Sequence, residues 1–172
     1  MRKSELHSSE YGYFYATYLN ALEDVDLCSE LTNGKLKFEQ FLNTLPLGKL
    51  SYRYSEGKWT IEEVLQHIID SERVFQYRAF HFSKNDRTPL PGFEQDDYVS
   101  ESERGRNIED ILHEFNSVRN STISLFKDLP KNKLKRIGTA SGMPWSVAAL
   151  GFVICGHQQH HLNILKERYL YY

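Results

Sequence analysis

The chain has 172 residues, a formal net charge of −2 and 40% apolar residues. This length suits a single domain with its own core. No apolar run approaches the roughly 18 residues that cross a membrane, and the N-terminus lacks the apolar stretch of a signal peptide. Two cysteines are too few for a disulfide framework or a thiolate metal site. The charge lacks the basic excess that nucleic-acid phosphates attract. We therefore expect a cytoplasmic protein without a membrane or nucleic-acid partner.

Four stretches of the sequence repeat apolar residues at helical spacing. They cover about residues 26–45, 60–85, 108–130 and 146–169. Thr60 and Glu63 form a capping-box pattern at the start of the second, whereas Gly34 is expected to weaken the first. The tyrosine-rich segment 11–22, which precedes them, is compatible with a short helix or a packed arm.

A long connection, residues 85–106, separates the second and third predicted helices. It exceeds what a tight antiparallel turn needs. A crossover of this length allows two consecutive helices to run parallel. The sequence therefore predicts an all-α fold, a four-helix bundle with a long crossover between helices 2 and 3.

Histidines occupy the apolar face of the last predicted helix. His157 and His161 continue the stripe of Leu150 and Ile154, and two imidazoles four residues apart can bind one ion. His160 is an alternative partner for His157, because a spacing of three is also usable, but it falls off the stripe. His67 lies at the edge of the apolar face of the second helix and could supply a third ligand. A hydrogen-bonded core histidine is the competing interpretation of each.

With these residues in view, the chain resembles the DinB-like (YfiT-type) family of bacterial metal-binding bundles. Three segments carry the resemblance: LSYRYSEGKWTIEEVLQHIIDSERVFQYRAF (50–80), TPLPGFEQDDYV (88–99) and GTASGMPWSVAALGFVICGHQQHHLNILKERYL (138–170). The resemblance implies one DinB-like domain over residues 1–172, with its core at about 13–170. It implies that His67, His157 and His161 bind a divalent metal, with zinc or nickel favoured over iron or manganese, and that the protein is a homodimer.

An open three-histidine site can activate water or a thiol. Relatives in the family include transferases that use low-molecular-weight thiols and proteins described as metal-dependent hydrolases. We expect a metal-dependent small-thiol S-transferase that acts on a small-molecule substrate. A hydrolase and a non-catalytic, stress-related metal-binding protein are the alternatives.

Four residues near the predicted site are candidates for further roles. Asp70, one helical turn after His67, could orient an imidazole or act as a base, or could be a solvated carboxylate. Arg73 and Arg78 could hold an anionic substrate group, although helix arginines usually pair with nearby carboxylates. Tyr98 in the crossover could form a wall of the site, or the loop could simply be packed.

Overall fold

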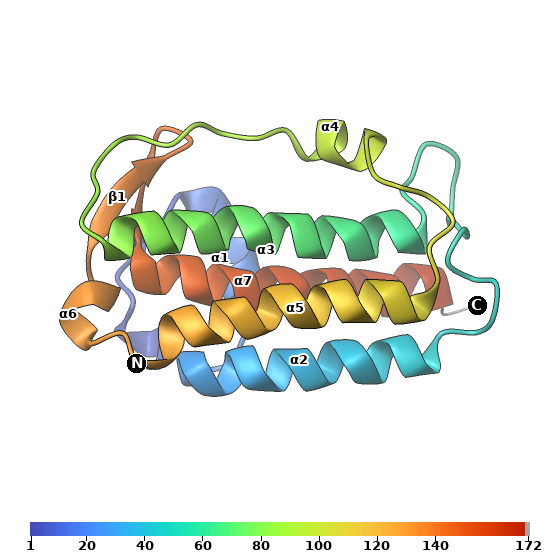
Figure 1. Cartoon of the computed structure of the whole chain (residues 1–172), viewed down its shortest axis with the longest axis horizontal. Helices are drawn as coiled ribbons and strands as arrows, with labels where there is room; N and C mark the ends of the chain where they lie inside the picture. Colours follow the sequence, from blue (N-terminus) through green and yellow to red (C-terminus); the bar gives the residue numbers. More distant parts are fainter. Residues whose placement is uncertain (171–172) are drawn as a thin grey trace.

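The computed structural model describes residues 1–170 and shows a four-helix bundle (Figure 1). The bundle helices are α2 (Leu27–Thr44), α3 (Ile61–Ser83), α5 (Ile108–Lys127) and α7 (Val147–Ile164). The shorter elements are the 3₁₀ turns η1 (Lys3–Glu5), η2 (Ser8–Glu10) and η3 (Tyr13–Tyr15), the helices α1 (Ala16–Asn20), α4 (Gln95–Ser100) and α6 (Lys131–Leu134), strands β1 (Ile137–Ala140) and β2 (Met143–Ser146), and a π-helical turn, η4 (Leu165–Leu170). The bundle predicted from the sequence is therefore confirmed.

The long crossover sets the direction of the helices. It leaves the end of α3, passes along the outside of that helix and returns to its starting end, where α5 begins (Figure 1). As a result α3 and α5 run parallel, and α2 and α7 run in the opposite direction. The short helix α4 lies within this crossover and packs against α3.

Each bundle helix begins at a side chain that caps its backbone. The capping residues are Asp26, Thr60, Asn107 and Ser146. At α3 the cap is reciprocal, because the Thr60 hydroxyl accepts from the Glu63 amide and the Glu63 carboxylate accepts from the Thr60 amide. These contacts satisfy amides that the first turn leaves without a helical partner.

Helix α7 is the central element of the bundle, buried on all sides from Val147 to Gln158. Gly156 is the reason that α1 can pack against it, since an added Cβ there would lie 2.1 Å from the Tyr18 carbonyl oxygen. This close approach of two backbones places Tyr18 beside the histidines of α7.

The all-α fold class holds, and the structure adds one small element that the sequence pattern did not predict. Strands β1 and β2 form an antiparallel hairpin that pairs Ile137 with Ser146 and Ala140 with Met143. Ser141 and Gly142 both have positive φ, 53° and 72°, as a two-residue type I′ turn requires. A bridge from Leu90 to Ala140 fastens the crossover to this hairpin.

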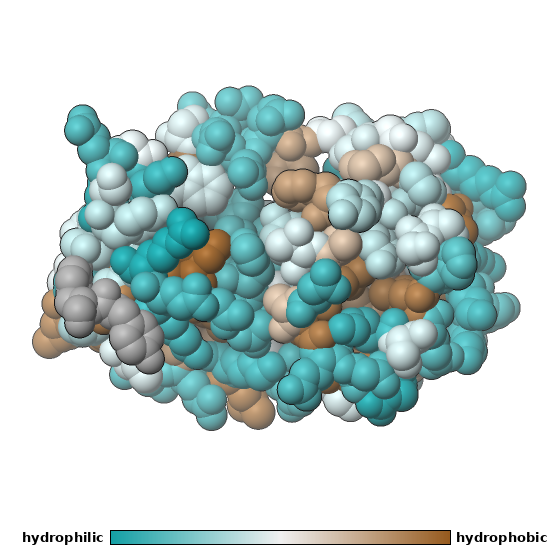
Figure 2. Space-filling view, turned by 180° about the vertical axis from the view of Figure 1, so that it is seen from behind, coloured by the Kyte–Doolittle hydropathy of each residue, from teal (hydrophilic) through white to brown (hydrophobic). Residues whose placement is uncertain are grey.

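The outer surface is mostly hydrophilic on the face opposite to that of Figure 1, and its hydrophobic residues form small, separate groups (Figure 2). Within residues 1–170, none of the helices has both the length and the apolar character to span a membrane.

Candidate metal centre

Three imidazoles from two antiparallel helices meet inside the bundle. Nitrogen atoms of His67 on α3 and of His157 and His161 on α7 all lie within 4.8 Å of one another. The Nε2 atoms of His67 and His157 are 2.9 Å apart, in hydrogen-bond contact. His67 and His157 are 3% and 4% exposed. The structure thus brings together the three histidines selected from the sequence, and His160 is not part of the group.

Burial keeps these imidazoles neutral at physiological pH. It lowers the pKa of His67 to about 4 and that of His161 to about 3. The pKa of His157 is also well below its usual value, because of burial and then of its neighbouring histidines. A neutral imidazole retains the lone pair with which histidine binds a metal.

The ring nitrogen atoms of the group have few partners within the protein. His161 Nε2 is buried and has no hydrogen-bond partner among the described residues. The Nδ1 atom of His67 faces the Ser71 hydroxyl at 3.4 Å, a contact that orients the ring. A buried nitrogen without a partner is costly, so the donor set fits a metal ion better than it fits an unliganded core.

A buried ion pair fixes the helices beside the histidines. The Arg119 guanidinium on α5 donates to both carboxylate oxygens of Glu72, at 2.7 Å each, and also to Gln158 Oε1. Gln158 then donates to the Gly34 carbonyl. Helix α2 runs unbroken through Gly34. A glycine is needed there because an added Cβ would lie 2.6 Å from Arg119 Nη1. Since Glu72 and Gln158 follow Ser71 and His157, this network holds both helices in register at the site.

A cleft of about 210 Å³, the histidine cleft, opens onto His67 and His157. Its lining residues are Phe14, Tyr15, Tyr18, His67, Ser71, Phe75, Phe93, Glu94, Gln95 and His157. Tyr18 packs edge-on against His157, with ring centroids 5.1 Å apart, and burial raises its pKa. Glu94 is the single carboxylate among the lining residues. No local pattern in the sequence predicts Tyr18 or Glu94 at this site, because the packing of α1 and the path of the crossover bring them here.

Two other candidates, Asp70 and Arg73, belong to a surface network. Asp70 accepts hydrogen bonds from Gln66 and Arg73, and Arg73 also pairs with Glu114. Asp70 lines two clefts along the outside of α3 but not the histidine cleft. Burial raises the pKa of Asp70, and the contacts with Gln66 and Arg73 oppose this shift.

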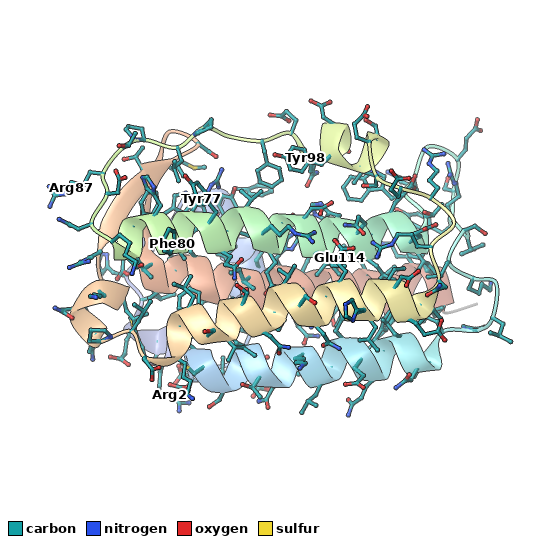
Figure 3. The ribbon with its side chains drawn as sticks, in the orientation of Figure 1. Arg2, Tyr77, Phe80, Arg87, Tyr98 and Glu114 are labelled. Carbon is teal, nitrogen blue, oxygen red and sulfur yellow. The ribbon has the colours of Figure 1, made fainter. Side chains whose placement is uncertain are left out.

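The last two candidates lie in the cleft between α3 and the crossover. These candidates are Tyr98 on α4 and Arg78 on α3. Tyr77 on α3 lines the same cleft, and Figure 3 labels Tyr77 and Tyr98. Arg78 is 2% exposed and donates through Nη2 to the Pro91 carbonyl and the Ser141 hydroxyl. The cleft adjoins the histidine cleft, because Phe93 lines both.

A helical bundle in which buried histidines from facing helices converge defines a class of candidate metal-binding bundle proteins. The DinB superfamily model matches residues 31–165 of this chain. The chain therefore belongs to the DinB superfamily, as its resemblance indicated.

Two relatives agree with this assignment. A protein of Oceanobacillus iheyensis, provisionally named a metal-dependent hydrolase, is 26% identical over 128 residues, which are 73% of each chain. The structure of YfiT from Bacillus subtilis superimposes with a TM-score of 0.72 at 17% identity, over 85% of this chain and 89% of YfiT. YfiT is described as a probable metal-dependent hydrolase with an unusual four-helix bundle topology. At this identity the likeness concerns the fold.

Proposed function

We propose that this protein is a metal-dependent hydrolase in which His67, His157 and His161 bind one divalent ion. The observation that carries the proposal is the convergence of three neutral imidazoles at one point, two of them buried and the third, His161, half-buried with a buried Nε2 atom that has no partner among residues 1–170. Three protein nitrogens leave at least one coordination position for water or substrate. Zinc and nickel suit imidazole ligands, and iron and manganese are alternatives.

The residues of the cleft can support hydrolysis in distinct ways. A bound divalent ion would supply Lewis acidity toward water and toward a carbonyl or phosphoryl oxygen. The Glu94 carboxylate would accept the proton of the attacking water, the role of a general base. The Tyr18 hydroxyl, whose raised pKa keeps it protonated, would donate a hydrogen bond to the developing oxyanion. The phenylalanine walls would restrict access of bulk water.

Hydrolysis replaces thiol transfer, the reaction favoured on the sequence alone, as the main proposal. The Oceanobacillus relative is named for hydrolysis, and the cleft supplies a carboxylate that can activate water. An S-transferase reaction and a non-catalytic metal-binding role are therefore alternative outcomes of the same experiment.

The experiment begins with protein stripped by a chelator and reloaded with zinc, nickel, iron or manganese in turn. Hydrolysis is measured on a panel of p-nitrophenyl esters, amides and phosphate esters. We expect one metal to restore turnover. Turnover that requires a thiol and consumes monochlorobimane would replace the hydrolase by the transferase. Loss of thermal stability on chelation, without turnover in either assay, would indicate the non-catalytic role.

Matched variants separate metal binding from proton transfer. His157→Ala should lose both metal and turnover, whereas His160→Ala, which changes the neighbour outside the group, should keep both. Glu94→Gln should keep the metal and lower kcat by about 10²–10⁴-fold, the usual contribution of a general base. Asp97→Asn is its control, because Asp97 lies on α4 but lines a different cleft. Equal kcat values for Glu94→Gln and the wild type would refute the assigned base.

A further inference from the structure

Arg78 is a buried cation without an anionic partner. Within residues 1–170, no carboxylate forms an ion pair with it, and its Nη1 atom is buried without a hydrogen-bond partner. Burial lowers the pKa of its guanidinium, in the direction expected for a desolvated charge. Arginines are almost never buried unless they are paired. Arg119, which is fully buried, is paired with Glu72, and this contrast makes Arg78 exceptional.

The hydrogen bonds that Arg78 makes hold its side chain in place but leave its positive charge without a counterion. Nη2 donates to the Pro91 carbonyl at 2.9 Å and to the Ser141 hydroxyl at 3.1 Å, which ties the crossover and the hairpin turn to α3. Both acceptors are neutral. The Tyr15 hydroxyl also lies within hydrogen-bonding range of the guanidinium and is neutral as well, yet Nη1 has no hydrogen-bond partner.

The guanidinium lies beside a cleft of suitable size for a small organic acid. This cleft, about 380 Å³, lies between α3 and the crossover and has apolar walls from Val74, Leu90 and Pro91. Asp70 is the acidic residue among its lining residues, and its carboxylate is already paired with Arg73 at 3.1 Å. Arg78 therefore carries the uncompensated positive charge of this cleft.

Two phenylalanines connect Arg78 to the histidine cleft. The guanidinium carbon lies 5.9 Å from the Phe75 ring centroid and 5.8 Å from that of Phe93. Both rings line the histidine cleft. The Phe75 ring is also 6.1 Å from the His157 ring, so the guanidinium and the His157 imidazole are at most about 12 Å apart. A single small molecule can span that separation.

We propose that Arg78 binds a carboxylate of the molecule whose reacting group binds at the three histidines. The ligand class is a small organic acid with an apolar middle, which passes Phe93 between the two clefts. This inference rests on the proposed metal site and adds a specificity residue to it. A carboxylate would complete the hydrogen bonding of Nη1 with a charge-assisted bond. It could belong to the hydrolysed substrate or to a thiol co-substrate, since the recognition chemistry is the same.

The test uses the protein loaded with cobalt(II) and a series of ω-mercapto acids with one to five methylene groups. The thiolate-to-cobalt absorption band reports binding at the histidines, independently of turnover. Mercapto alcohols of the same lengths are the neutral counterparts. We expect the acid to bind about 10-fold or more tightly than its alcohol at the best length, as one charge-assisted hydrogen bond supplies.

Variants assign this advantage to one side chain. Arg78→Met should remove the advantage of the acid while leaving the affinity of the alcohol unchanged, and Arg78→Lys should retain part of it. Arg73→Met is the matched control on the same helix, and it should retain the whole advantage because Asp70 and Glu114 already pair with that arginine. If Arg78→Met does not fold, the affinities of acid and alcohol are compared in the wild type and in Arg78→Lys. A smaller advantage of the acid in Arg78→Lys would still assign the advantage to residue 78, and an unchanged advantage would contradict it.

The outcomes distinguish the inference from the proposed function. Equal affinities of acids and alcohols at every length would overturn the role of Arg78 and leave the metal site intact. The absence of any cobalt–thiolate band would overturn the metal site and the inference with it. In the turnover assays, consumption of the mercapto acid would assign the carboxylate to a co-substrate, and competitive inhibition of hydrolysis that is stronger for the acid than for its alcohol would assign it to the substrate; either result supports the proposal.

Discussion

Mild acid is expected to destabilise the metal-free protein through its buried histidines. In the folded chain the pKa of His67 is about 4 and that of His161 about 3, whereas an unfolded histidine titrates near 6.5. Between these values the unfolded state binds more protons than the folded state. The free energy of unfolding must therefore fall as the pH falls through 6.5. Above pH 7.5 neither state is protonated, and the effect vanishes.

The magnitude follows from proton linkage. Between pH 7.5 and pH 5.5, a histidine that stays neutral in the folded state and titrates at 6.5 when unfolded contributes a loss of about 1.4 kcal/mol. His67 and His161 together give about 3 kcal/mol, and His157, whose pKa is shifted in the same direction, adds to this loss. This is a large share of the roughly 5–15 kcal/mol that stabilises a typical domain.

Urea denaturation of chelator-treated protein at pH 7.5, 6.5 and 5.5, followed by circular dichroism, measures this loss. His67→Gln should reduce it by about 1.4 kcal/mol, because one titrating group is removed. His113→Gln is the control, since His113 is an exposed histidine on α5, and it should leave the loss unchanged. A free energy of unfolding that stays constant from pH 7.5 to 5.5 would refute the argument that the bundle interior keeps the three imidazoles neutral.

Three further substitutions test the core around the site. Arg119→Met should cost about 3–5 kcal/mol in urea denaturation, because it leaves the Glu72 carboxylate buried and unpaired; a cost below 1 kcal/mol would contradict this. Gly156→Ala should lower stability by about 1–3 kcal/mol, since its methyl group meets the Tyr18 carbonyl, and an unchanged melting temperature would show that α1 is not packed there. Cys155, whose pKa burial raises to about 12, should react with Ellman's reagent only on unfolding, and rapid labelling of the native protein would disagree.

The helices could be predicted from sequence because their signals are local. Asp26, Thr60, Asn107 and Ser146 each cap the helix that follows them, and apolar spacing marks the buried face. The hairpin was missed because its four-residue strands are too short for a periodic signal. Its stability also depends on Leu90, which reaches it from the crossover, 50 residues away along the chain. The homodimer and the absence of a nucleic-acid partner stay predictions.

The residues of the site could likewise be predicted only where their signal is local in the sequence. His157 and His161 could be found because both lie on one apolar stripe of a single helix. Gly156 could also have predicted the packing of α1, since a glycine inside a long helix often marks the close approach of another backbone. Glu94 could not be selected, and Arg78 could not be ranked above Arg73, because their surroundings depend on the path of the crossover over α3. Arg78 in particular is distinguished by the partner that it lacks, which only the structure reveals.

The topology explains why the two clefts lie side by side. Antiparallel packing of α3 on α7 brings the first half of α3, with His67, to the last half of α7, with His157 and His161 (Figure 1). Arg78 lies 11 residues further along α3, about 16 Å of helical rise, and its side chain leans back toward the start of the helix. The crossover must retrace α3 so that α5 can run parallel to it, and it therefore covers both positions. The connection between α3 and α5 thus also provides the wall, Phe93, that lies between the cation and the histidines.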